Sequence, residues 1–90
     1  MYEDIQRFVE RVESTLNEVV ETGSDDDLFV AGYFHGHFSL AVSQINPAHP
    51  EPIAALDAIV KNNLEQAFAN AELAPEDQAK VWQLWATLQQ

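Results

Sequence analysis

Apolar residues in the first 22 positions recur with the period of an α-helix. Starting from Ile5, successive apolar positions are separated by 3, 1, 3, 4, 3 and 1 residues, which places them on one face of a helix with 3.6 residues per turn. Gly23 follows, and glycine is common directly after the last residue of a helix. The pattern therefore predicts an amphipathic helix over residues 2–22. Its buried face comprises Ile5, Phe8, Val9, Val12, Leu16, Val19 and Val20.

The next apolar stretch, Leu28–Ile45, is 18 residues long and contains no Lys, Arg, Asp or Glu. Ser24 and Asp27 precede it with the spacing of a capping box, in which each side chain accepts a hydrogen bond from the backbone of the other residue. Pro47 follows it, and a proline disfavours the α conformation of the residue before it. We therefore predict a helix over about 25–45, with Ser24 and Asp27 as its structural cap.

Two stripes of different residue size run along this second helix. Small residues form one stripe, at Gly32, Gly36, Ser39 and Ser43, and large residues form a roughly opposite one. The large stripe comprises Phe34, Phe38, Ala41, Val42 and Ile45. Each glycine within a helix costs about 1 kcal/mol relative to alanine, which suggests that the small stripe lets a neighbouring helix approach closely. We expect this helix to be buried at the centre of a bundle. The aromatic segment 33–38 also suits a strand, and that alternative stays open.

A proline-rich loop at 46–52 separates these helices from two further helical patterns. Residues 53–71 carry apolar side chains at helical spacing, and a fourth helix begins near Pro75, a residue favoured in the first turn. Glu76 and Asp77 suit the positive end of its dipole. We therefore predict an all-α fold, a small four-helix bundle forming a single domain over residues 1–90.

Charge is the most extreme property of the chain. Fifteen Asp and Glu oppose four Lys and Arg, which gives a formal net charge of −11. Such a field repels nucleic-acid phosphates and anionic membrane surfaces. We therefore expect no nucleic acid and no membrane as partner, and the charge favours basic proteins or cations instead, with an unknown protein as the partner considered. The charge alone also keeps a protein soluble and disfavours association, so a monomer or a weak homodimer is expected.

Several features favour a cytoplasmic location. The chain has no cysteine, which fits a reducing compartment. It begins with Met1-Tyr2-Glu3-Asp4 and lacks the basic start of a secretory signal. Glycine, serine and histidine interrupt the uncharged run, so we do not interpret it as a membrane span.

Histidines and clustered acids are the candidate metal ligands. His35 and His37 would share one side of a strand, but on a helix they point about 200° apart, so they cannot bind one ion together. We interpret His37 as a structural, hydrogen-bonded histidine and only a weak metal candidate, and His49 as a surface residue. The acids at 25–27 lack the alternating spacing of a calcium loop. The sequence predicts no catalytic residue and no cofactor.

Two tryptophans mark the last helix. Trp85 lies on its apolar face and is predicted to be in the core. Trp82 lies at the edge of that face, and tryptophan is enriched at binding hot spots. Trp82 could therefore form an interaction surface with Tyr2 or Phe8.

Two segments, SDDDLFVAGYFHGHFSLAV and LAPEDQAKVWQLW, resemble the YfcL family of small bacterial proteins. The matching positions are Ser24, Asp25, Asp26, Asp27, Leu28, Phe29, Gly32, Tyr33, Gly36, His37, Leu40 and Ala41, and then Leu73, Pro75, Asp77, Gln78 and Ala79. The resemblance implies a helical domain and supplies no catalytic residues. Ala74 departs from the family pattern, which tends to have serine there. Because alanine cannot cap a helix, the fourth helix should begin less firmly.

Two functional hypotheses follow. The first is a non-enzymatic, acidic interaction or adaptor protein, which predicts an exposed apolar patch bordered by acids. The second is a small-molecule or metal-binding domain, with minor enzymatic activity as a variant, that uses His37, Tyr33 and nearby acids. It predicts a pocket in which His37 meets a carboxylate.

Overall fold

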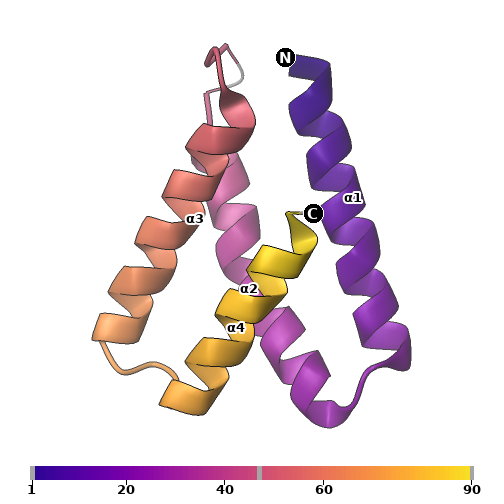
Figure 1. The fold of residues 1–90 in the computed structure, drawn as a ribbon, viewed down its shortest axis with the longest axis vertical. Coiled ribbons are helices and arrows are strands. Elements are labelled where there is room, and N and C mark those ends of the chain that lie inside the picture. Colours follow the sequence, from indigo (N-terminus) through magenta and orange to yellow (C-terminus); the bar gives the residue numbers. More distant parts are fainter. Residues whose placement is uncertain (1, 47, 90) are drawn as a thin grey trace.

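The computed structural model describes residues 2–46 and 48–89, with the backbone alone for residues 2–4. Four helices make up the fold (Figure 1): α1 (Tyr2–Thr22), α2 (Asp25–Gln44), α3 (Pro52–Ala69) and α4 (Pro75–Leu88). No strand occurs among these residues. The predicted all-α, four-helix fold is therefore confirmed, and the strand alternative for 33–38 is wrong because that segment lies within α2.

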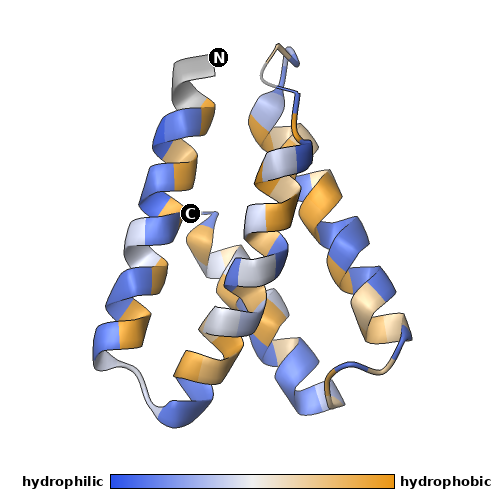
Figure 2. Ribbon diagram, turned by 180° about the vertical axis from the view of Figure 1, so that it is seen from behind, coloured by the Kyte–Doolittle hydropathy of each residue, from blue (hydrophilic) through white to orange (hydrophobic). Residues whose placement is uncertain are grey.

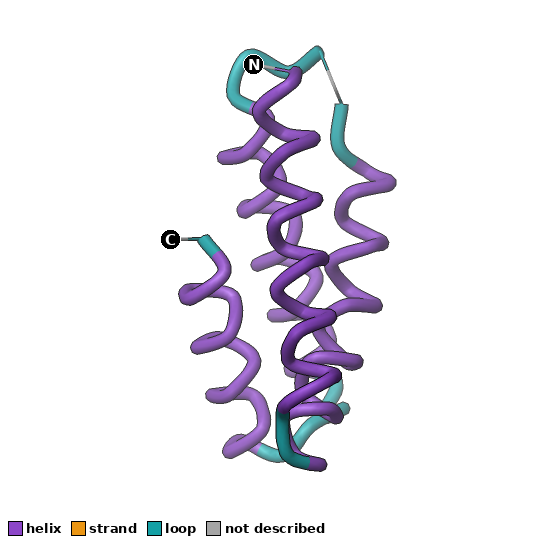
Figure 3. Tube along the Cα trace, turned by 90° about the vertical axis from the view of Figure 1, so that its right-hand side faces the viewer, coloured by secondary structure: helices purple, strands orange, loops and turns teal. Residues whose placement is uncertain are grey.

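Helix α2 is central, as predicted, because it packs against each of the other three helices. In Figure 1, α4 crosses in front of α2, and α1 and α3 lie to either side. Seen from behind, α2 is the helix nearest the viewer (Figure 2). The side view places α4 and the upper part of α2 on opposite sides of the array (Figure 3). One side of α2 therefore faces its neighbours, and the other faces outward.

The core is built around Trp85 of α4. Its ring centroid lies 6.0 Å from that of Phe8, 5.5 Å from that of Phe34 and 5.9 Å from that of Phe38. These rings come from α1, α2 and α4, and all four are buried. Aromatic pairs at such separations contribute about 0.5–1.5 kcal/mol beyond their buried area. The predicted core position of Trp85 and the large stripe of α2 are thus confirmed.

The connection between α1 and α2 is short and sterically constrained. The amide of Gly23 donates a 2.7 Å hydrogen bond to the carbonyl oxygen of Val19. Gly23 does not adopt the left-handed conformation typical of a glycine after a helix. A Cβ atom at this position would lie 2.6 Å from the Val19 oxygen and 2.8 Å from Cβ of Asp27. Glycine is needed here for close approach, not for its backbone angles.

The C-terminus of α3 does use the left-handed region. Ala71 has a φ of 59°. Its amide donates to the carbonyl oxygen of Phe68 at 3.0 Å, and the amide of Glu72 donates to that of Ala67 at 3.4 Å. This is the Schellman arrangement, with alanine where glycine is preferred. It ends α3 two residues earlier than predicted and turns Glu72 back toward α2.

Within the described part of the chain, no helix has the length and hydropathy that crossing a bilayer requires.

Candidate functional site

The acidic cluster before α2 is a helix cap. The amide of Asp27 donates to Oγ of Ser24 at 3.2 Å, and the amide of Ser24 donates to Oδ2 of Asp27 at 3.1 Å. This confirms the predicted capping box. Asp26 also contacts Nζ of Lys80 in α4 at 3.4 Å. Capping accounts for Asp27, and this ion pair accounts for Asp26.

The outward face of α2 departs from the prediction. We define it by its exposed residues, Asp25, Leu28, Phe29, Gly32, Gly36, Ser39, Leu40 and Ser43. The two glycines were expected to contact a neighbouring helix. Instead, among the described residues, nothing lies within 4 Å of a Cβ built at Gly32 or Gly36. The neighbouring helices pack on the large stripe, because burying Phe34 and Phe38 removes far more apolar surface from water.

Large apolar side chains are exposed on this outward face. Phe29 is 52% exposed, Leu40 is 50% exposed and Leu28 is 36% exposed. The expectation that α2 is buried nearly all round is therefore wrong. In Figure 2, which shows the molecule from behind, the ribbon near the start of α2 is orange, the colour of hydrophobic residues. Exposed residues of this kind on one helix face are candidates for contact with a partner.

The histidines of α2 lie in different environments. Nε2 of His35 lies 3.8 Å from Oε2 of Glu13 in α1, and both side chains are about half exposed. The ring of His37 lies against that of Tyr33, with centroids 4.8 Å apart. Contrary to the prediction of a hydrogen-bonded histidine, Nδ1 of His37 is buried and has no hydrogen-bond partner among the described residues. As predicted, the two histidines do not converge on one point.

Tyr33 links α2 to the turn after α3. Its hydroxyl donates a 2.9 Å hydrogen bond to Oε1 of Glu72. Burial raises the pKa of Tyr33 to about 12, and the hydrogen bond and negative charge of Glu72 add to the shift. His37 and Glu72 line a shallow pocket of about 220 Å³ at this place. Sequence reasoning proposed Tyr33 and His37 together but could not identify Glu72, which lies 39 residues from Tyr33.

A metal site requires more ligands than this pocket offers. Among the described residues, no group of three or more His, Cys, Asp or Glu side chains is placed to hold an ion. His49 instead accepts a 2.9 Å hydrogen bond at Nδ1 from the amide of Glu51 in its own loop. The pocket near His37 suits a polar small molecule better than a metal ion alone.

A polar contact that the sequence did not reveal lies beside the core. Oδ1 of Asp57 accepts hydrogen bonds from Nε1 of Trp85 at 2.7 Å and from Nε2 of Gln89 at 2.9 Å. Oδ2 lies 3.0 Å from Nζ of Lys61, as the i, i+4 spacing predicts. Burial alone would raise the pKa of Asp57, but these hydrogen bonds and the charge of Lys61 hold it below its ordinary value. The contact fixes the orientation of Trp85.

The predicted surface around Trp82 does not form as expected. Phe8 is 7% exposed, and the Arg11 guanidinium lies 5.3 Å from its ring centroid. This burial contradicts its predicted place in an exposed patch. Trp82 is half-buried and packs edge-on against Phe68, with centroids 5.6 Å apart. The side chain of Tyr2 lies outside the described residues. Trp82 and Phe8 therefore pack against different neighbours.

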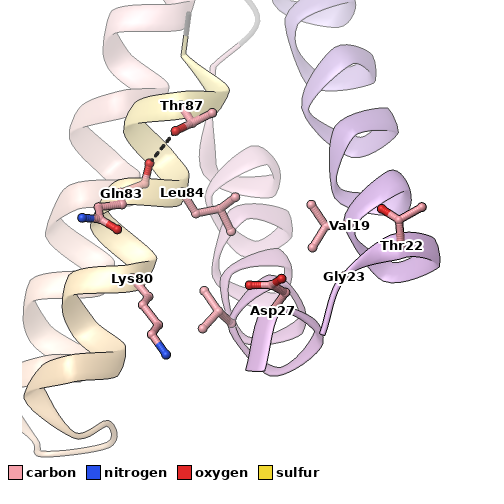
Figure 4. A pocket seen from close by; sticks show the side chains of 9 residues that line it. Val19, Thr22, Gly23, Asp27, Lys80, Gln83, Leu84 and Thr87 are labelled. Carbon is pink, nitrogen blue, oxygen red and sulfur yellow. Dashed lines mark hydrogen bonds between the residues drawn. The ribbon is translucent and has the colours of Figure 1, made fainter. Parts of the chain in front are cut away.

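A hollow of about 440 Å³ lies between the end of α1, the start of α2 and α4 (Figure 4). Val19 and Leu84 supply apolar walls, and Lys80 and Asp27 lie at one end. Asp27 is already used in the helix cap, and Thr87 donates to the backbone of Gln83 at 3.0 Å. Asp27 and Thr87 thus bond within their own segments, and Lys80 pairs with Asp26 of α2, so these polar groups converge on no common point.

Comparison with known proteins finds one family. The profile of the YfcL protein family matches residues 6–90. A relative from Escherichia coli (strain K12), named "Uncharacterized protein YfcL", is 35% identical over 84 residues, which cover 93% of this chain and 91% of the relative. No solved structure matches the chain.

Proposed function

The chain belongs to the YfcL family, and from its own surface we propose that it is a non-enzymatic cytoplasmic interaction protein that binds through the outward face of α2. One observation carries the proposal. Phe29 and Leu40 are each about half exposed on a face that carries no charge from residue 28 to residue 45. A cysteine-free chain suits that compartment.

The surroundings of this face favour a protein partner. The net charge of −11 opposes binding to nucleic acid and to anionic lipid. Removing half-exposed aromatic and aliphatic side chains from water favours association with another apolar surface. Gly32 and Gly36 lie between Phe29 and Leu40 and have no side chains, so a partner can approach the helix backbone there.

Site-specific photocrosslinking in the source cells tests the proposal. A benzophenone amino acid replaces Phe29 in one variant and the exposed Ala86 of α4 in a control. We expect a discrete protein adduct from position 29, none from position 86, and loss of the adduct when Gly36→Leu is added. An adduct that forms equally at both positions, or that survives Gly36→Leu, contradicts the proposal.

A second candidate function is binding of a polar small molecule or a metal ion beside His37. The observation in its favour is that His37 and Glu72 line one pocket, with Glu72 held by the Tyr33 hydroxyl. Amide NMR spectra recorded with added Zn²⁺ test the metal version. Shifts near residues 37 and 72 that vanish in His37→Ala but persist in His49→Ala would support it. An unchanged spectrum would discard it.

A further inference from the structure

We infer that the outward face of α2 binds the same face of a second copy of this chain, with the two α2 helices antiparallel. The inference rests on the proposed function, because it names the partner of the same surface. Three features of the face identify that partner: the spacing of its residues, the pairing of its residues after reversal, and the distribution of charge.

The spacing is that of a helix–helix seam. Exposed positions 25, 29, 32, 36, 39 and 43 follow one another at intervals of 4, 3, 4, 3 and 4 residues. This alternation keeps one line of residues facing a neighbouring helix along a left-handed crossing. The seam residues are exposed, and no described residue lies within 4 Å of a Cβ built at Gly32 or Gly36, so the described helices leave the centre of the seam uncovered.

Reversal about residue 34 pairs every residue of the outward face with another residue of that face, and Leu28 then lies opposite Leu40 of the second copy. In an antiparallel pair Gly32 lies opposite Gly36 of the second copy, and Phe29 lies opposite Ser39. Asp25 lies opposite Ser43, whose hydroxyl donates to the carbonyl oxygen of Leu40 at 2.6 Å within one copy and must rotate to donate to the carboxylate instead. A two-fold interface requires this kind of self-complementarity, since each residue contacts a different residue of the same surface. The two glycines allow the helix axes to approach closely at the crossing.

Charge selects the antiparallel arrangement. A parallel pair would place two copies of the Asp25–Asp27 cluster side by side, and like charges repel at short range. In the antiparallel pair the clusters lie toward opposite ends of the 20-residue helix, and in this register Asp26 of the two copies is separated by about 24 Å along the axis. That separation exceeds the Debye length of about 8 Å at physiological salt. Asp25 is the one carboxylate on the outward face of α2 and lies at its end, so two copies repel each other less over this face than over the rest of the acidic surface.

The interface is small, so the dimer is weak. One helix from each copy covers less than the standard interface of about 1,600 Å². We expect a dissociation constant on the order of 100 µM. Added salt should tighten the association, because it screens the repulsion between two copies of charge −11.

Sedimentation equilibrium from about 10 µM to about 1 mM, on either side of that constant, tests the inference. We expect the wild type and the control Ala86→Leu to dimerise and Gly36→Leu to remain monomeric. Circular dichroism checks that Gly36→Leu keeps its fold, which the open space around Gly36 permits. A wild type that stays monomeric throughout, or a Gly36→Leu variant that dimerises as well, overturns the inference.

Disulfide trapping tests the arrangement, because the chain contains no cysteine of its own. Phe29→Cys and Ser39→Cys are mixed and oxidised. We expect the mixed disulfide to exceed either homodisulfide, and equal or larger homodisulfide yields would refute the antiparallel register. If the wild type is monomeric but position 29 still crosslinks specifically to another protein in cells, the self-association is wrong and the proposed function stands. If position 29 gives no specific adduct at all, the proposed function fails as well.

Discussion

Gly23 and Gly36 should respond in opposite ways to the same substitution. Gly36 lies within α2, where glycine costs about 1 kcal/mol relative to alanine, and a Cβ there meets nothing within 4 Å among the described residues. Gly36→Ala should therefore raise the free energy of unfolding by about 1 kcal/mol. For a domain of this size, that corresponds to an increase in Tm of about 4–8 °C.

Gly23→Ala should lower stability. The new Cβ would lie 2.6 Å from the Val19 carbonyl oxygen and 2.8 Å from Cβ of Asp27. Relief of these contacts must move the start of α2 and weaken the Ser24–Asp27 capping box. Loss of such a cap costs about 0.5–2 kcal/mol, so we expect a decrease of at least about 1 kcal/mol.

Thermal unfolding followed by far-UV circular dichroism compares the two variants with the wild type. Protein concentrations of a few micromolar keep self-association from adding to apparent stability. Gly32→Ala should raise the Tm as Gly36→Ala does, because the surroundings of Gly32 are equally open. A lower Tm in Gly36→Ala would refute the outward orientation of this stripe, and an unchanged Tm in Gly23→Ala would refute the steric account of the turn.

Four further predictions follow from local structure. Ala71→Gly should raise the free energy of unfolding by about 1 kcal/mol, measured by urea denaturation, since a left-handed residue other than glycine costs about 1–2 kcal/mol; a loss would contradict the Schellman assignment. Ala74→Ser should add roughly 0.5–1 kcal/mol, because Ala74 makes no side-chain cap to α4; no gain would mean that the serine does not cap. Absorbance at 295 nm should show that the Tyr33 hydroxyl ionises near pH 12 in the wild type and at a lower pH in Glu72→Gln. The stability that Tyr33 contributes is present below pH 10 and should be lost as the pH rises toward 12. The pKa of Asp57 is lowered in the folded protein, so the stability that Asp57 contributes is present above pH 3.8, its ordinary pKa, and is lost as the pH falls through its folded pKa. The acid denaturation of Asp57→Asn should lack that pH dependence.

Local patterns predicted most of the fold, because each helix carries its own signals. The period of Ile5 to Val20 and the Ser24–Asp27 spacing act over a few residues, and the structure has α1 and the capping box where they were predicted. Val20 is an exception, because it was predicted on the buried face and is 53% exposed. The end of α3 was predicted too late because Asn70 and Ala71 carry no glycine signal. Periodicity also shows which residues share a face, but it does not show which face a neighbour covers. Both stripes of α2 lack charge, so the small one was assigned to the interior in error.

Contacts between distant parts of the chain were beyond sequence reasoning. Asp57 and Trp85 are separated by 28 residues, and Tyr33 and Glu72 by 39. Each pair forms where different parts of the chain meet in the folded protein, and the spacing of neighbouring residues does not reveal that contact. The position of Phe8 illustrates the same limit: its burial depends on Trp85 of α4, and neither residue alone reveals that they pack together.

The apolar residues on the outward face of α2 also link solubility to acidity. At neutral pH the net charge of −11 keeps the association between copies weak. Near the isoelectric point of about 4.2 that repulsion disappears while the apolar side chains remain. Colloidal stability should then fall through exposed apolar side chains such as Phe29, and crystals grown at that pH should show α2 packed against α2.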